Sequence, residues 1–275
     1  MTAFRPTEGP VVLNVTPEIA GWDYVGFEVI ELAAGQTEMR TFAAREAAVV
    51  PLEGAGSVTV AGTRHELSRS SVFEELAPIA YVTPGDEIVI STDAGFTVAI
   101  GSAPAEGRYP SRLVEIPEQR SEVRGGGQAY RQVIHSMAPP IDAERLILYQ
   151  VYVPRGTWSG WAPHCHDGRD GSPYLEETYY FRLDRPEGFA MHRNWREDED
   201  FDEVDVAHDG DVVLVPKGYH SSVACPGANM YFLNVLAGEL IGDERSTPPC
   251  FDAQFTWIEA DWTAGEWNLP VVPTT

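Results

Sequence analysis

Hydrophobic residues along the chain fall in short runs, and helical spacing is scarce. Apolar and β-branched residues cluster over four to nine positions, and Gly, Pro or Asp stands next to nearly every cluster. Many short strands separated by turns predict an all-β sandwich or small barrel. The runs are Tyr24–Leu32, Ala47–Leu52, Ser57–Val60, Glu87–Ile90 and Phe96–Ile100 in the first half, and Arg145–Val153, Thr178–Leu183, Gly188–Arg193, Asp211–Val215 and Met230–Leu236 in the second.

A segment without this pattern separates the two series. Val114–Gln128 contains Pro117, a charged stretch and three consecutive glycines, Gly125–Gly127, a composition typical of an exposed, flexible connection. We therefore predict two lobes, residues 1–120 and residues 121–275, with a boundary near residue 120.

A weak internal repeat accompanies this division. Gly85-Asp86 and Gly210-Asp211 each stand directly before an apolar run of strand length. Two unrelated hairpins would produce the same pattern, so the repeat alone leaves the relation between the lobes open.

The charge of the chain narrows its partners. Acidic residues outnumber basic ones by 42 to 19, and the formal net charge of -23 repels nucleic acid and anionic lipid surfaces. A small anionic substrate meets the same field, so its site needs a local cluster of Arg, Lys or metal cations.

Cysteine usage and hydropathy indicate the compartment. Cys165, Cys225 and Cys250 are odd in number, widely spaced and without a CxxC pair, which favours a reducing environment over a disulfide framework. The first residues lack the apolar core of a signal peptide, and no later run reaches the roughly 18 apolar residues of a membrane span. We expect a soluble, cytoplasmic protein with no membrane partner.

Candidate metal ligands gather in the second half. His164 and His166 lie two positions apart, so both imidazoles project from one face of an extended strand. Glu177 lies in a strand-like run, and His220 follows an apolar run and a Pro-Lys-Gly turn. Three histidines and a carboxylate suit Zn, Mn, Fe, Co or Ni, and the spacing does not choose among these divalent metals.

Glu176 competes with Glu177 for the carboxylate position. Successive side chains of a strand point to opposite faces, so only one of the two can point into a barrel. Strand alternation alone does not say which one.

The motifs resemble a known family. His-x-His, a glutamate on the next strand and a later histidine after Gly-Asp-strand-Pro-x-Gly form the metal pattern of cupin barrels. The chain further resembles the bicupin family of 5-deoxyglucuronate isomerase over residues 124–238. The stretches that carry the resemblance are Arg124–Gly127 with Arg131–Ile134, Pro163–Asp167, Leu175–Arg182, Gly210–His220 and Tyr231–Gly238.

This resemblance implies a fold, a ligand set and a reaction. The fold would be a bicupin of two jelly-roll β-barrel lobes, with the metal on His164, His166, Glu177 and His220 and a metal-free N-terminal lobe. Glu-x-Tyr is the form that the carboxylate ligand takes in related cupin isomerases, and this favours Glu177. The reaction would convert 5-deoxy-D-glucuronate to 5-dehydro-2-deoxy-D-gluconate in inositol catabolism, an aldose–ketose isomerisation.

Such a reaction needs a base for the proton and a cation for the substrate carboxylate. Glu176, Tyr179 and His192 are the candidate bases. Arg182 is the first candidate for the cation, with Arg193 and Lys217 as rivals, and all of these choices rest on sequence position. A homodimer is compatible with the resemblance. A cupin dioxygenase and a non-catalytic sugar-binding cupin stay as alternatives, although no helix-turn-helix pattern accompanies the latter.

Overall fold

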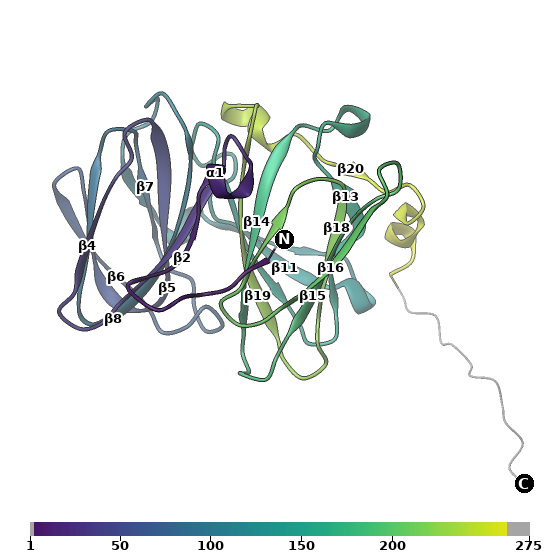
Figure 1. The fold of residues 1–275 in the computed structure, drawn as a ribbon, viewed down its shortest axis with the longest axis horizontal. Helices are drawn as coiled ribbons and strands as arrows, with labels where there is room; N and C mark the ends of the chain where they lie inside the picture. The colour runs from purple at the N-terminus through teal and green to yellow at the C-terminus, as the bar shows by residue number, and fades with distance from the viewer. Residues whose placement is uncertain (1–2, 263–275) are drawn as a thin grey trace, which may run out of the picture.

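The computed structural model describes residues 3–262, and within this range the chain is almost entirely β, as expected. The single α-helix of this range, α1 (Pro17–Ala20), is four residues long. No helix in the described part is both long and apolar enough to cross a membrane. Two β lobes lie side by side, purple and blue for the first half and green for the second (Figure 1).

The N-terminal lobe is one strongly bent sheet of eight strands. Six of them follow the order β2-β3-β8-β5-β7-β9, while β4 pairs with β8 and β6 pairs with β5. Their bounds are β2 (Val11–Val15), β3 (Gly26–Leu32), β4 (Thr37–Thr41), β5 (Arg45–Val60), β6 (Thr63–Arg69), β7 (Ile79–Val82), β8 (Glu87–Pro104) and β9 (Arg112–Val114).

Two long strands, β5 and β8, fold this sheet over on itself. Their pairing shifts register twice, between Pro51 and Glu53 and between Ala55 and Ser57. Such bulges bend a strand sharply. At the bend, a Cβ on Gly54 would lie 2.2 Å from the carbonyl oxygen of Gly95, so only glycine allows this approach. The bend encloses a cluster of aliphatic side chains and Phe96.

The C-terminal lobe is a sandwich of two sheets. One has the order β1-β17-β14-β19-β12-β11-β10 and the other the order β16-β15-β18-β13-β20. The first sheet contains β1 (Ala3–Phe4), β10 (Arg120–Arg124), β11 (Arg131–His135), β12 (Ile147–Val153), β14 (Leu175–Leu183), β17 (Val212–Val215) and β19 (Met230–Gly238). The second contains β13 (Trp158–Cys165), β15 (Ala190–Arg196), β16 (Phe201–Ala207), β18 (Tyr219–Ala224) and β20 (Cys250–Phe251).

The core of this sandwich is apolar at one end and polar at the other. Phe181, Val213 and Phe232 from the first sheet pack with Ala190 and Ala224 from the second.

The three cysteines are free thiols. The predicted division into residues 1–120 and 121–275 stays a prediction, and residues 263–275 lie outside the described part.

A shared core joins the lobes. Buried residues of β3 and β5 form one continuous cluster with buried residues of β12, β14 and β19. The sheets approach closely enough that a Cβ on Gly101 would lie 2.7 Å from a methyl of Val235. The large apolar contact makes the two lobes one packed body.

Three buried glutamates, Glu46, Glu144 and Glu176, form hydrogen bonds between the two lobes. We call them the junction carboxylates. Each accepts hydrogen bonds from three successive main-chain N–H groups across the junction. Glu46 of the first lobe binds residues 144–146 of the second, Glu144 binds residues 106–108, and Glu176 binds residues 23–25. Hydrogen bonds to an ionised acceptor are about twice as strong as neutral ones.

Candidate metal centre and cavity

Three histidines converge inside the C-terminal lobe. His164 lies near the end of β13, His166 directly after it and His220 on the neighbouring β18, where it is the register partner of His164. One ring nitrogen from each lies within 4.8 Å of the others. Three imidazoles at this separation are placed to bind a single metal ion.

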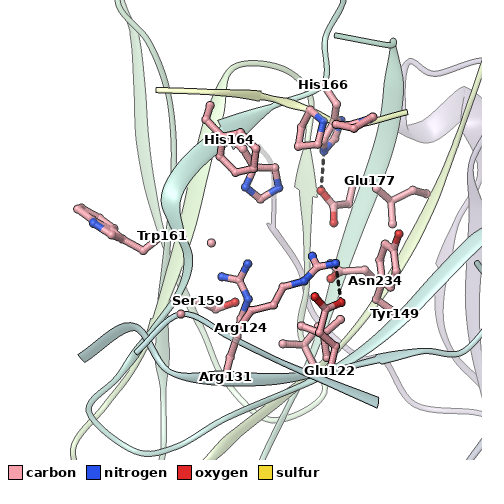
Figure 2. Close-up of a pocket in the computed structure, with 18 of the residues that line it drawn as sticks. Glu122, Arg124, Arg131, Tyr149, Ser159, Trp161, His164, His166, Glu177 and Asn234 are labelled. Atoms are coloured by element: carbon pink, nitrogen blue, oxygen red, sulfur yellow. Dashed lines mark hydrogen bonds and ion pairs between the residues drawn. The ribbon is translucent and has the colours of Figure 1, made fainter. Parts of the chain in front are cut away.

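Glu177 on β14 faces the histidines from the opposite sheet (Figure 2). Its Oε2 lies 2.8 Å from Nε2 of His166 and 3.2 Å from Nε2 of His220. Burial disfavours its charged form, but the hydrogen bond with His166 and the close contact with His220 outweigh this and lower the pKa of Glu177. The group is an ionised carboxylate at neutral pH.

The chemistry of these four side chains fits a divalent metal. Nδ1 of His166 lies 2.9 Å from the carbonyl oxygen of Leu175, to which it donates, so Nε2 is left as a ligand atom. Nε2 of His220 is buried and has no hydrogen-bond partner within residues 3–262. A buried nitrogen left without a partner beside a carboxylate is expected where an ion completes the site.

Glu176 points the other way, as alternation along β14 requires. Its oxygens lie 2.7 to 2.8 Å from the main-chain nitrogens of Asp23, Tyr24 and Val25 at the lobe junction. Burial raises the pKa of Glu176, against the effect of these hydrogen bonds. The structure therefore does not bring Glu176 to the histidines.

A cavity of about 700 Å³ opens in front of this cluster. His164, His166 and Glu177 form part of its wall, and the C-terminal segment from Ser246 to Trp262 forms another part. The remaining polar wall consists of Glu122, Arg124, Arg131, Tyr149, Ser159, Tyr179 and Asn234. Its size suits a ligand of six or so carbon atoms with room for water.

Tyr179 and His192 lie close to the cluster. Tyr179 lines the cavity, and burial, followed by the charge of Glu177, raises the pKa of its phenol well above the ordinary range. His192 lies behind Tyr179, with Nδ1 2.7 Å from the hydroxyl of Ser222. Burial, followed by the neighbouring His220, lowers the pKa of His192 to about 3, so its ring is neutral.

The three predicted cations for the substrate carboxylate lie elsewhere. Arg182 pairs with Asp209 at 2.8 Å and with Glu53 at 3.3 Å. Arg193 pairs with Asp202 at 2.7 Å, and Lys217 pairs with Glu199. None of the three lines the cavity.

Two arginines that we did not predict as site residues point into the cavity instead. Arg124 ends β10 and Arg131 begins β11, and they are register partners in this hairpin. Both side chains point toward the wall with His164 and Glu177 (Figure 2). Both belong to the motif Arg124–Gly127 with Arg131–Ile134. Arg124 lies within Val114–Gln128, for which the sequence predicts an exposed, flexible connection. That prediction is wrong at this point, because residues 120–124 form β10 and Arg124 lines the cavity.

Solved structures resemble the whole fold. An IolB-like protein from Salmonella typhimurium LT2 superposes with a TM-score of 0.89 at 33% identity, covering 94% of this chain and 99% of that one. Oxalate decarboxylase from Lactobacillus farciminis superposes with a TM-score of 0.63 at 12% identity over 88% of this chain and 87% of that one, a likeness of fold alone. Two packed β lobes with a histidine cluster inside one of them define a cupin-type protein with a site suited to a metal.

The chain belongs to the KduI/IolB family, whose model matches residues 2–258. A relative from Geobacillus kaustophilus, named 5-deoxy-glucuronate isomerase, is 40% identical over 239 residues, which are 85% of this chain and 86% of the relative. A relative of the same name from Bacillus subtilis strain 168 is 33% identical over 243 residues, 83% of this chain and 86% of the relative. The chain is therefore an enzyme of the isomerase class, an intramolecular oxidoreductase.

Proposed function

We propose that the protein is a metal-dependent aldose–ketose isomerase that converts 5-deoxy-D-glucuronate to 5-dehydro-2-deoxy-D-gluconate in the cytoplasmic catabolism of inositol. The observation that carries the proposal is the cluster of His164, His166, His220 and Glu177 at the wall of a cavity of about 700 Å³. The names of the relatives support the substrate.

The four side chains of the cluster would hold one divalent metal, which is Zn, Mn, Fe, Co or Ni by ligand type. When bound there, it supplies a Lewis acid for the carbonyl and the adjacent hydroxyl of an aldose. His166 and Glu177 are held in orientation by the carbonyl oxygen of Leu175 and by β14. A rigid ligand set of this kind favours one binding geometry for the substrate.

The reaction moves protons and requires no outside oxidant. The proton on C2 moves to C1, and the hydroxyl proton of C2 moves to the oxygen of C1, so the aldehyde becomes an alcohol and C2 a ketone. Tyr179 keeps its proton at neutral pH because its pKa is raised. The protonated phenol would donate a hydrogen bond to a substrate oxygen, while Tyr179 and His192 stay the candidate bases for the C2 proton.

Turnover of 5-deoxy-D-glucuronate under nitrogen, without nicotinamide or ATP, tests the reaction. We expect complete loss of the aldehyde signal by NMR under these conditions. A cupin dioxygenase, which the same ligands would permit, would instead require O₂. Strict dependence on O₂ would overturn the isomerisation.

Removal of the ligands tests the metal. The variants His164→Ala, His166→Ala and His220→Ala should each lose metal by elemental analysis and lose turnover, because one of four strong ligands is gone. His65→Ala, on β6 of the other lobe, is the matched control and should keep both. Stoichiometric metal in all three site variants would contradict the assignment.

A further inference from the structure

Arg131 presents its guanidinium to the cavity, and no acidic side chain of residues 3–262 lies within ion-pair distance of it. Its Nη1 is shielded from solvent and has no hydrogen-bond partner in the described part of the chain. The side chain lines the same cavity as His164 and Glu177. A guanidinium is always charged in a protein, and a buried charge without a partner is destabilising.

Other buried arginines of the protein show what a satisfied guanidinium looks like here. Arg69 donates to two main-chain carbonyl groups and to Gln150 and Tyr152 at 2.8 to 3.0 Å. Arg245 donates to the carbonyl oxygens of Leu146, Gly242 and Ile141. Arg131, which is only partly buried, has no such set of acceptors within the described part of the chain, so its shielded Nη1 is left to bind a ligand in the cavity.

The neighbouring Arg124 already has an anionic partner. Its Nη2 lies 3.1 Å from Oε2 of Glu122, an oxygen that is also 2.8 Å from Nε2 of His135 and 3.3 Å from Nη1 of Arg120. Burial opposes the charged form of Glu122, but Arg124 and His135 lower its pKa to about 2. Glu122 therefore stays an anion and holds Arg124 beside Arg131. Within residues 3–262, Arg131 forms no ion pair of this kind, and its Nη1 makes no hydrogen bond.

We propose that Arg131, with Arg124 beside it, binds the carboxylate of the sugar acid and thereby places the opposite end of the substrate at the histidine cluster. This rests on the proposed function and names the residue that selects an acid over a neutral sugar. A substrate carboxylate would give Arg131 an anionic partner, and its two oxygens match the paired N–H donors of a guanidinium.

Binding of D-gluconate and D-glucitol by isothermal titration calorimetry tests the proposal on the metal-loaded protein at pH 7. The two compounds differ only by a carboxylate in place of a CH₂OH group, and neither has a carbonyl to isomerise. We expect the wild type to bind D-gluconate at least tenfold more tightly than D-glucitol. Arg131→Gln should remove that preference, and Arg131→Lys should restore only part of it because lysine lacks the fork.

Arg193→Gln is the matched control, since Arg193 is an arginine of the same lobe that pairs with Asp202 outside the cavity. It should keep the full preference. Metal content and thermal melting check that each variant is folded. If Arg131→Gln does not fold, Arg131→Lys alone carries the test. An unchanged preference in both Arg131 variants, or its loss in Arg193→Gln, would overturn the proposal.

The outcome is independent of turnover. A wild type that binds D-gluconate through Arg131 but does not isomerise 5-deoxy-D-glucuronate would remove the proposed function and leave the acid-binding site. If the wild type isomerises the substrate but its preference for D-gluconate depends on another residue, the proposed function stands and the role of Arg131 is removed.

Discussion

Two adjacent glutamates of β14 have unrelated surroundings. Glu177 faces the histidines, while Glu176 accepts three main-chain hydrogen bonds at the lobe junction. The difference follows from strand alternation alone, since neighbouring side chains leave opposite faces of the sheet. Both residues are almost fully buried, with 1% and 3% of their surfaces exposed for Glu176 and Glu177.

Substitution by glutamine separates their roles. Glu177→Gln should weaken metal binding roughly a hundredfold or more, because loss even of residues behind a ligand changes affinity 10- to 100-fold. Glu176→Gln should keep the metal and lower the free energy of unfolding by about 1.5 to 3 kcal/mol, the value of hydrogen bonds to a charged group. Metal titration and urea denaturation measure the two effects. The opposite pattern would mean that β14 is shifted by one residue.

The sequence predicted the histidines better than the cations. A two-residue spacing fixes a shared strand face, so His164 and His166 could be placed from local geometry. Arg124 and Arg131 reach the cavity because β10 and β11 form a hairpin that packs over it. The spacing of the two arginines in the sequence does not show which cavity they face. Arg182, Arg193 and Lys217 pair with acidic side chains, which are abundant in a chain with 42 of them.

A bulge in β13 aims His164 at its neighbours. The pairing of β13 with β18 shifts register between Ser159 and His164, and Gly160 within this interval has a φ of +76°. A Cβ on Gly160 would lie 3.3 Å from the carbonyl oxygen of His220. The bulge lets one element supply His164 and His166 while its partner supplies His220.

Alanine at Gly160 tests this arrangement. Gly160→Ala should lower the free energy of unfolding by about 1 kcal/mol through the positive φ and weaken metal binding about tenfold by displacing His220. Gly85→Ala is the control, since Gly85 has a φ of +89° and open space around it. It should show a similar loss of stability with unchanged metal affinity. Equal metal affinity in both variants would exclude a role for the bulge in the site.

Strand prediction found many of the apolar runs but missed β2 and β7, and it divided strands at bends. The separate strands expected at Ala47–Leu52 and Ser57–Val60 are parts of β5, and those at Glu87–Ile90 and Phe96–Ile100 are parts of β8. The intervening glycines looked like turns, but they allow bulges within one strand. β16 was not predicted because Asp202, Glu203 and Asp205 interrupt its apolar positions.

At the scale of the whole molecule, one junction carboxylate, Glu144, links stability to pH. Burial opposes the charged form of Glu144, but the main-chain N–H groups of residues 106–108 and the charge of Arg108 lower its pKa from the ordinary 4.5. A lowered pKa in the folded state adds stability that is complete above the ordinary value. This stability is lost as the pH falls from about 4.5 through the lower pKa of the folded protein.

Glu144→Gln should remove this contribution. The variant should lose about 1.5 to 3 kcal/mol of unfolding free energy at pH 7, and the difference from the wild type should shrink below pH 4.5 as Glu144 is protonated. Glu106→Gln, at an exposed side chain, should change stability little at either pH. Urea denaturation at pH 7 and pH 4 measures both. A difference that grows on acidification would contradict the assignment.

β1 also has a consequence for the order in which the protein can be assembled. Ala3 and Phe4 pair with Val213 and Val212 of the C-terminal lobe, although the chain between them first builds the whole N-terminal lobe. During translation, β1 therefore leaves the ribosome 208 residues ahead of its partner (212 − 4). At about 5 to 20 residues per second, this strand waits on the order of 10 to 40 s for the edge to which it binds. The N-terminal lobe can close during that interval, so β1 is among the last strands to pair although it is made before that lobe.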